Sequence, residues 1–165
     1  TFWLAPDFVD QAKRLLPFVN KDNAKAWATG LLLEGPALTA TDNVSIVQAY
    51  LGEEYSPPIP CVIPEATIRE LVRIKEPPRW AAVSLRSITF YYGEGDRFIC
   101  SRLMPNDWPD INKFFAQQQE LVPLSEDFWE GVDTLLDFAN DQGAIIFESD
   151  RMRTSKDEKL SLIHI

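Results

Sequence analysis

The chain has 165 residues, of which 45% are hydrophobic and 25% are charged, an ordinary composition for a soluble globular protein of this length. Acidic residues outnumber basic ones by 25 to 16, and the formal charge of -9 excludes a uniformly basic nucleic-acid coat, although not a local basic surface. No apolar run reaches the roughly 18 residues of a transmembrane helix, and no signal-peptide pattern opens the chain. We therefore expect a soluble, cytoplasmic protein without membrane association.

Both ends of the chain suggest a fragment. The first residue is Thr1 rather than Met, and residues 160–165 read LSLIHI, which is one translated frame of a sequencing-library adapter. We expect this tail to be a scar of library construction. His164, the single histidine of the chain, lies inside the tail, so mechanisms that need a histidine base or metal ligand lose that group.

In chain order, a strand followed by a helix is predicted three times. The copies are residues 1–19 (TFWLAPDFVDQAKRLLPFV), 61–74 (CVIPEATIRELVRI) and 121–139 (LVPLSEDFWEGVDTLLDFA). Taking Pro6, Pro64 and Ser125 as equivalent helix starts gives spacings of 58 and 61 residues. Proline suits the first helical turn and serine suits the N-cap. The apolar residues of each copy fall on one helix face: Phe8, Ala12, Leu15 and Val19; Ile68, Leu71 and Val72; Phe128, Val132, Leu135, Leu136 and Ala139.

After each helix the hydrophobic period changes from 3.6 to 2, which predicts short strands. These are residues 26–33, 37–41 and 44–51 after the first helix, 80–85, 87–92 and 97–103 after the second, and 144–148 after the third. The pattern predicts an α+β fold with antiparallel sheets, built from duplicated strand–helix–three-strand half-domains. We expect half-repeats at about 1–58 and 59–118, and the start of a further domain at 119–159.

The sequence contains little that indicates catalysis. Cys61 and Cys100 lie in separate predicted strands without C-x-x-C spacing, which predicts two reduced, buried thiols and no zinc site. There is no Walker loop and no dinucleotide-binding glycine motif. We expect no catalytic residue, metal or cofactor, and thus no enzyme. Asp107 and Asp110 keep open the alternative of a small carboxylate-dependent hydrolase, and exposed tryptophans such as Trp27 or Trp108 that of a carbohydrate- or peptide-binding module.

Five short motifs, in order, resemble those of one family. They are GLLLE at 30–34, LTATDN at 38–43, VIP at 62–64 with EL at 70–71, FICSRL at 98–103 and WPD at 108–110. Their order and spacing are similar to those of the β sliding clamps of bacteria and phages, the processivity subunit (DNA polymerase III beta subunit) of the replicative polymerase. The resemblance covers roughly residues 1–150. It implies the DNA-clamp fold, with sheets outside and helices lining a channel, in a homo-oligomeric ring.

The resemblance implies two functional sites. Sequence-independent contact with double-stranded DNA would fall on Lys13, Arg14, Lys21, Lys25, Trp27, Arg69 and Arg73. A pocket for short apolar peptide motifs of DNA polymerase, the clamp loader and other clients would be formed by Ala28, Thr41, Asn43, Val44, Ser45, Ile46, Pro109 and Phe114.

The chain departs from the family pattern at specific positions. Glu65 and Ala66 stand where the family has a basic pair, and the predicted third helix carries Glu130, Asp133 and Asp137. In the pocket motif, Asn43 replaces a turn glycine, and Val44-Ser45 replaces an aromatic or histidine residue followed by arginine. Asparagine is the non-glycine residue that best tolerates a left-handed backbone, so the turn is expected to persist.

Overall fold

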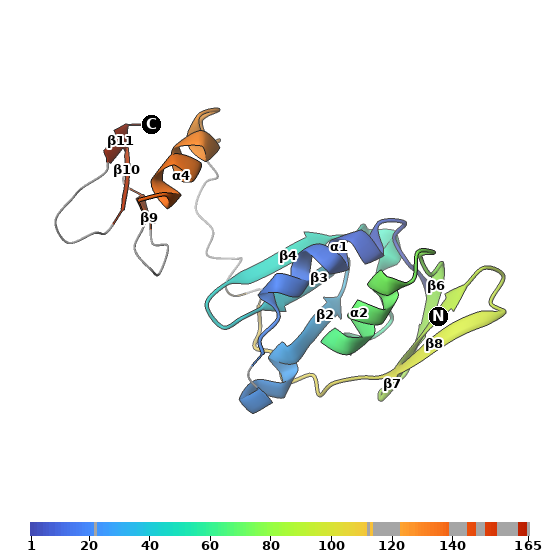
Figure 1. Cartoon of the computed structure of the whole chain (residues 1–165). Helices are drawn as coiled ribbons and strands as arrows, with labels where there is room; N and C mark the ends of the chain where they lie inside the picture. Colours follow the sequence, from blue (N-terminus) through green and yellow to red (C-terminus); the bar gives the residue numbers. More distant parts are fainter. Residues whose placement is uncertain are drawn as a thin grey trace. The chain divides into compact units, whose positions relative to one another are not determined.

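A computed structural model describes residues 1–21, 23–111, 113, 123–138, 145–147, 151–154 and 162–164 (Figure 1). The chain divides into two compact units, Thr1–Ile111 and Asn112–Ile165. No helix among the described residues is long and apolar enough to cross a membrane. The domain limit predicted near residue 118 falls in a stretch outside the described residues and stays a prediction.

The first unit contains two antiparallel sheets and two α-helices. Its first half consists of β1 (Phe2–Trp3), α1 (Phe8–Leu15), the 3₁₀ helices η1 (Leu16–Phe18) and η2 (Asn23–Thr29), β2 (Gly30–Glu34), β3 (Ala37–Thr41), β4 (Ile46–Tyr50) and the 3₁₀ helix η3 (Glu53–Tyr55). Its second half consists of β5 (Cys61–Pro64), α2 (Glu65–Arg73), β6 (Trp80–Val83), β7 (Ser87–Tyr92) and β8 (Arg97–Arg102). The α+β class and the duplicated order of elements are confirmed.

The two halves exchange their first strands. One sheet has the order β1-β6-β7-β8 and the other has the order β4-β3-β2-β5. Thus β1 pairs with β6 of the second half, Trp3 opposite Trp80, while β5 pairs with β2 of the first half, Ile63 opposite Leu31. The exchange is reciprocal, so neither half completes a sheet from its own strands.

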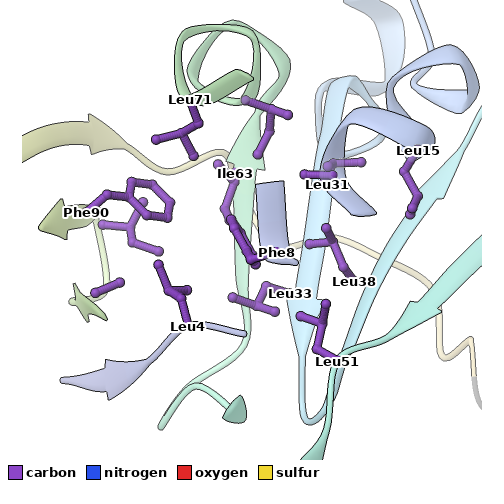
Figure 2. Packing of buried hydrophobic residues seen from close by; sticks show 14 of the residues in the cluster. Leu4, Phe8, Leu15, Leu31, Leu33, Leu38, Leu51, Ile63, Leu71 and Phe90 are labelled. Atoms are coloured by element: carbon purple, nitrogen blue, oxygen red, sulfur yellow. The ribbon is translucent and has the colours of Figure 1, made fainter. Parts of the chain in front are cut away.

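The helices cover the inner faces of both sheets and enclose one hydrophobic core (Figure 2). Phe8 of α1 and Leu71 of α2 are buried among strand residues that include Leu31, Leu38 and Phe90. The two helices lie side by side (Figure 1). The apolar faces predicted for both helices therefore bind the two half-repeats into one unit.

The strand β2 is buried on both faces, which explains its unbroken run of leucines. Leu31 and Leu33 face the helices, whereas Leu32 points to the opposite side and is also buried. The segment after β8 returns to this sheet, where Met104 N donates a hydrogen bond to Val62 O at 3.0 Å. The same segment ends at Ile111, which is buried.

An aromatic row crosses the outer face of the β1-β6-β7-β8 sheet. Trp3, Trp80, Tyr91 and Phe98 are paired in register across the four strands. The rings of Trp80 and Tyr91 stack with centroids 3.8 Å apart, so each covers one face of the other. Trp3 and Phe98, at the ends of the row, are exposed.

The second unit contains α4 (Phe128–Leu136) and an antiparallel sheet of β9 (Ile145–Phe147), β10 (Arg151–Thr154) and β11 (Leu162–His164). Leu135 and Met152 are buried between helix and sheet. The strand β11 lies in the tail that we expect to be a scar, and the pairing does not test that expectation. Ala139 lies outside the described residues.

Two details of the first unit correct the sequence-based expectations. Residues 26–29 form part of the 3₁₀ helix η2 rather than a strand, because their polar groups are bonded locally and to a distant residue: Thr29 Oγ1 donates to Ala26 O, and Trp27 O accepts from Trp108. Cys61 is buried as expected. Cys100, however, is exposed, because it points to the outer face of the edge strand β8.

Candidate nucleic-acid interface and peptide groove

The helices present one exposed side away from the core. On α1, burial of Phe8, Ala12 and Leu15 leaves Lys13 and Arg14 exposed in the last helical turn. On α2, burial of Ile68 and Leu71 leaves the charged residues Arg69, Glu70 and Arg73 exposed. The four basic residues predicted on the helices are therefore all accessible.

The two helices differ in how their basic side chains are compensated. Arg69 forms an ion pair with Glu65, one turn earlier, and its Nε lies 2.9 Å from Glu65 Oε1. Arg73 pairs with Glu70 at 2.9 Å. Lys13 and Arg14 have no carboxylate within ion-pair distance among the described residues. Uncompensated positive charge on this side is thus contributed by α1 and not by α2.

The predicted contacts at the start of the first sheet have specific partners. Lys21 is exposed, whereas Lys25 Nζ donates a hydrogen bond to Asn43 Oδ1 at 3.2 Å. Trp27 is half-buried, and its ring meets that of Trp108 edge-on at 5.2 Å. Trp108 Nε1 donates to Trp27 O at 2.8 Å, which fixes both side chains. This pair is not the flat, exposed platform that a carbohydrate-binding module would need, so the exposure expected for that alternative is wrong.

A rigid turn joins β3 to β4. Asp42 Oδ1 accepts hydrogen bonds from Val44 N at 2.9 Å and Ser45 N at 2.6 Å. These N–H donors, Ser45 first and Val44 second, hold the pKa of the Asp42 carboxyl below its ordinary value. Asn43 has φ of 73°, the left-handed conformation, as expected for its replacement of a glycine.

The structure brings most of the predicted peptide-pocket residues to this turn. Thr41 is buried, and its hydroxyl donates to Ser45 O at 2.7 Å. Val44, at the tip of the turn, is 93% exposed. The remaining positions differ in accessibility: Ala28 is buried, Asn43 and Pro109 are exposed, Ser45 and Ile46 are half-buried, and Phe114 lies outside the described residues. Thr41 supports the turn by this hydrogen bond, and the buried residues Ala28 and Thr41 offer a ligand little surface of their own.

The carboxylates considered for a hydrolase do not form a buried pair. Asp107 and Asp110 are both exposed in the segment after β8. Among the described residues, no group of three or more His, Cys, Asp or Glu side chains could hold a metal ion.

Sequence reasoning did not find one further feature. A cavity of about 710 Å³ lies between the β6–β7 turn and the end of β8, where it is lined by Leu85, Arg86 and Arg102 among others. Its only sequence signal is a leucine followed by an arginine where the predicted strands 80–85 and 87–92 meet. The structure ends β6 at Val83, so Leu85 lies in the turn and not in the strand as predicted.

Comparison with known proteins identifies the fold. No family model and no curated protein matches the sequence. Among solved structures, the DNA polymerase sliding clamp of Bacillus subtilis matches with a TM-score of 0.66 and 16% identity, over 99% of this chain and 48% of that protein. The sliding clamp of Bartonella birtlesii, bound to griselimycin, matches with a TM-score of 0.68 and 18% identity, over 99% and 50%. The Helicobacter pylori clamp bound to a DNA ligase peptide matches with a TM-score of 0.67 and 17% identity, over 99% and 49%.

These matches span nearly all of this chain but only about half the length of each clamp. The reciprocal half-repeats, the paired helices and the antiparallel sheets agree with the matches. The chain has the fold of the DNA polymerase III beta sliding clamps.

Proposed function

We propose that this chain is part of a DNA sliding clamp, a non-enzymatic ring that encircles duplex DNA and tethers a replicative polymerase to it. The observation that carries the proposal is the duplicated unit itself, in which α1 and α2 lie together with an exposed basic side. In the proposed ring, this side faces the channel and the sheets face outward.

The charge distribution supports sliding rather than tight binding. Each phosphate neutralised by a basic side chain strengthens binding and increases its dependence on salt. The chain carries a net charge of -9, and its α2 arginines are paired with glutamates. Lys13 and Arg14 therefore supply a weak attraction, which holds DNA in the channel without fixing its position.

The DNA-facing side is tested by duplex binding at low salt, measured by fluorescence anisotropy. Charge reversal in Lys13→Glu/Arg14→Glu should weaken binding about tenfold or more and reduce the log–log salt slope by about two, one for each phosphate contact. The matched control is Arg86→Glu/Arg102→Glu, which reverses two exposed arginines away from the helices. Equal weakening by both variants would contradict a DNA site on the helices.

The proposed encirclement of DNA is tested by comparing retention of the protein on circular and linear DNA. A ring formed by the full-length protein should remain on a nicked circular plasmid at moderate salt and slide off the same plasmid after linearisation. Equal loss of the protein from circular and linear DNA would contradict the clamp function. Gel filtration coupled to light scattering measures the mass of the protein and so reports self-association into a ring.

The β3–β4 turn is the second proposed site, which would bind a short leucine- and phenylalanine-rich peptide of polymerase, clamp loader or other clients. The exposed Val44 side chain offers an apolar anchor on a turn that Asp42 holds rigid. A fluorescein-labelled Leu- and Phe-rich peptide should bind the chain, and Val44→Asp should weaken that binding. Phe98→Asp is the matched control, because Phe98 is also an exposed apolar residue and lies on the outer sheet face. Equal effects of the two substitutions would contradict a peptide site at this turn.

We also propose that residues 119–159 begin another clamp domain. The start of α4 repeats the start of α1 at an offset of 120 residues: Phe8 N donates to Ala5 O, and Phe128 N donates to Ser125 O. In the first unit, Val9, Leu16 and Phe18 pack against the core. Their counterparts at the same offset, Trp129, Leu136 and Phe138, are exposed.

A second half-repeat would cover that apolar surface in the proposed domain. A hydrophobic dye should therefore bind the chain, and Trp129→Ser should reduce the dye fluorescence. Unchanged fluorescence in that variant would contradict an uncovered surface at Trp129.

A further inference from the structure

The cavity between the β6–β7 turn and the end of β8 combines apolar walls with positive charge. Its volume of about 710 Å³ lies within the range of ligand-binding clefts in proteins. The apolar lining residues are Pro64, Leu85, Leu103, Met104 and Pro105, and Arg86 lies among them. Arg102 stands at the end of β8 and also lines the cavity.

Both arginines of the cavity are available to a ligand. Arg86 and Arg102 are exposed, and neither has a carboxylate within ion-pair distance among the described residues. Three other arginines of this acidic chain, Arg69, Arg73 and Arg97, are each paired with a glutamate. Two unpaired guanidinium groups beside one hollow attract carboxylates, which arginine binds with directed hydrogen bonds.

The walls of the cavity are held in place by main-chain and hydroxyl contacts. Ser84 Oγ accepts hydrogen bonds from Arg86 N at 3.3 Å and Ser87 N at 3.1 Å, which fixes the turn. Leu103 N donates to Arg86 O at 2.9 Å and so ties the turn to the end of β8. A partner would therefore meet a largely pre-formed site, which lowers the entropic cost of binding.

Leu85 indicates that the partner also has apolar side chains. This leucine is 90% exposed at the tip of a turn, where the fold gains nothing from an apolar residue. A bound apolar side chain would cover it and remove that surface from water.

The Arg102 side chain points away from the proposed DNA-facing side. Arg102 lies opposite Ser87 in the β7–β8 register, whereas the next residue of β7, Ile88, points into the core beneath the helices. Because successive side chains of a strand point to opposite faces, Arg102 lies on the sheet face turned away from the helices.

We infer that this cavity binds an extended peptide segment of a partner protein in which leucine-like residues alternate with carboxylates. The arginines recognise the carboxylates, and Leu85 with Met104 contacts the apolar side chains. The inference goes beyond the clamp function, since neither DNA nor the proposed peptide site at the β3–β4 turn involves these residues.

The probe is a fluorescein-labelled Leu-Asp-Leu-Asp-Leu peptide, titrated with the whole chain and followed by anisotropy. Arg86→Glu/Arg102→Glu should weaken binding by about tenfold or more, because each lost charged hydrogen bond alone is worth roughly that factor. Leu85→Ser should also weaken it. Lys13→Glu/Arg14→Glu and Phe98→Asp are the controls and should leave it unchanged. All of these side chains are exposed, so the substitutions leave the core intact.

Peptides of changed chemistry separate the two components of recognition. Leu-Lys-Leu-Lys-Leu should not bind, and Ser-Asp-Ser-Asp-Ser should bind more weakly than the leucine peptide. Equal binding of all three peptides, no binding of the leucine–aspartate peptide at millimolar concentration, or an equal effect of the control variants would overturn the inference. Loss of duplex DNA binding in Arg86→Glu/Arg102→Glu would also overturn it, since DNA would then be the ligand of this face.

Discussion

The packing of Phe8 on Phe90 should make the two half-repeats of the first unit energetically interdependent. Phe8 comes from α1 of the first half and Phe90 from β7 of the second, and both are at most 1% exposed. Their ring centroids are 6.1 Å apart, tilted by 37°. Truncating a buried phenylalanine to alanine costs about 3–5 kcal/mol. That is a large part of the roughly 5–15 kcal/mol that stabilises a typical domain.

Because that loss would come close to unfolding the unit, the coupling is better measured with Phe8→Leu and Phe90→Leu. Each leucine variant should cost less than about 1.5 kcal/mol, since it largely conserves core volume. The aromatic pair contributes about 0.5–1.5 kcal/mol beyond its buried area, and this contribution disappears in either single variant. The double variant should therefore be less destabilised than the sum of the two single variants by about that amount.

The assay is urea unfolding of the four proteins of this cycle, analysed by linear extrapolation after fluorescence and circular dichroism transitions have been shown to coincide. Phe98→Leu is the control, because Phe98 is exposed on the outer sheet face and its replacement should change stability by less than about 0.5 kcal/mol. Additive costs, within about 0.3–0.5 kcal/mol, would refute the interdependence of the halves at this contact.

Four further predictions follow from single positions. Gly30→Ala should destabilise the first unit by about 1–3 kcal/mol in thermal unfolding, because the added Cβ would collide with a main-chain carbonyl of β5. Asn43→Val should cost about 1–2 kcal/mol and Asn43→Gly should be nearly neutral, since φ is positive there. The exposed thiol of Cys100 should react rapidly with Ellman's reagent. The thiol of Cys61 should react only on unfolding, because burial blocks access and raises its pKa to about 12. The pKa of Asp42 is lowered in the folded state, so its contribution to the free energy of unfolding should be complete above its unfolded pKa. That contribution should be lost as pH falls through the folded pKa. Asp42→Asn should remove this acid dependence, measured by urea unfolding at a series of pH values.

Regular alternation made two strands of the first unit predictable with their exact bounds. The bounds 37–41 and 87–92 agree with β3 and β7, the two strands of that unit that are preceded and followed along the chain by strands paired with them. Residues 26–29 have a similar apolar pattern, yet Trp27 O accepts a hydrogen bond from Trp108, 81 residues later. A contact so distant in the chain leaves no local signal in the sequence.

The exchange of first strands could not be predicted from the sequence for a similar reason. Local patterns establish that residues 61–64 and 1–3 are strand-like, but they do not say which sheet each strand joins. The pairing of Ile63 with Leu31 and of Trp3 with Trp80 is decided by burial across the whole unit. Exposure of Cys100, in contrast, follows from period-two alternation, since Ile99 beside it packs against the core.

The candidate site was predictable by position but not by charge. The spacing of Arg69 and Arg73 places them on one side of α2, which suggested a basic surface. The same spacing rule applies to the acidic residues of that helix, and each arginine is occupied by a glutamate one turn away. The helix α2 therefore offers duplex DNA almost no net charge, and the attraction depends on Lys13 and Arg14. For the proposed clamp this is a physical advantage, because a ring already confines DNA by its topology, and each further phosphate contact would add friction without adding retention.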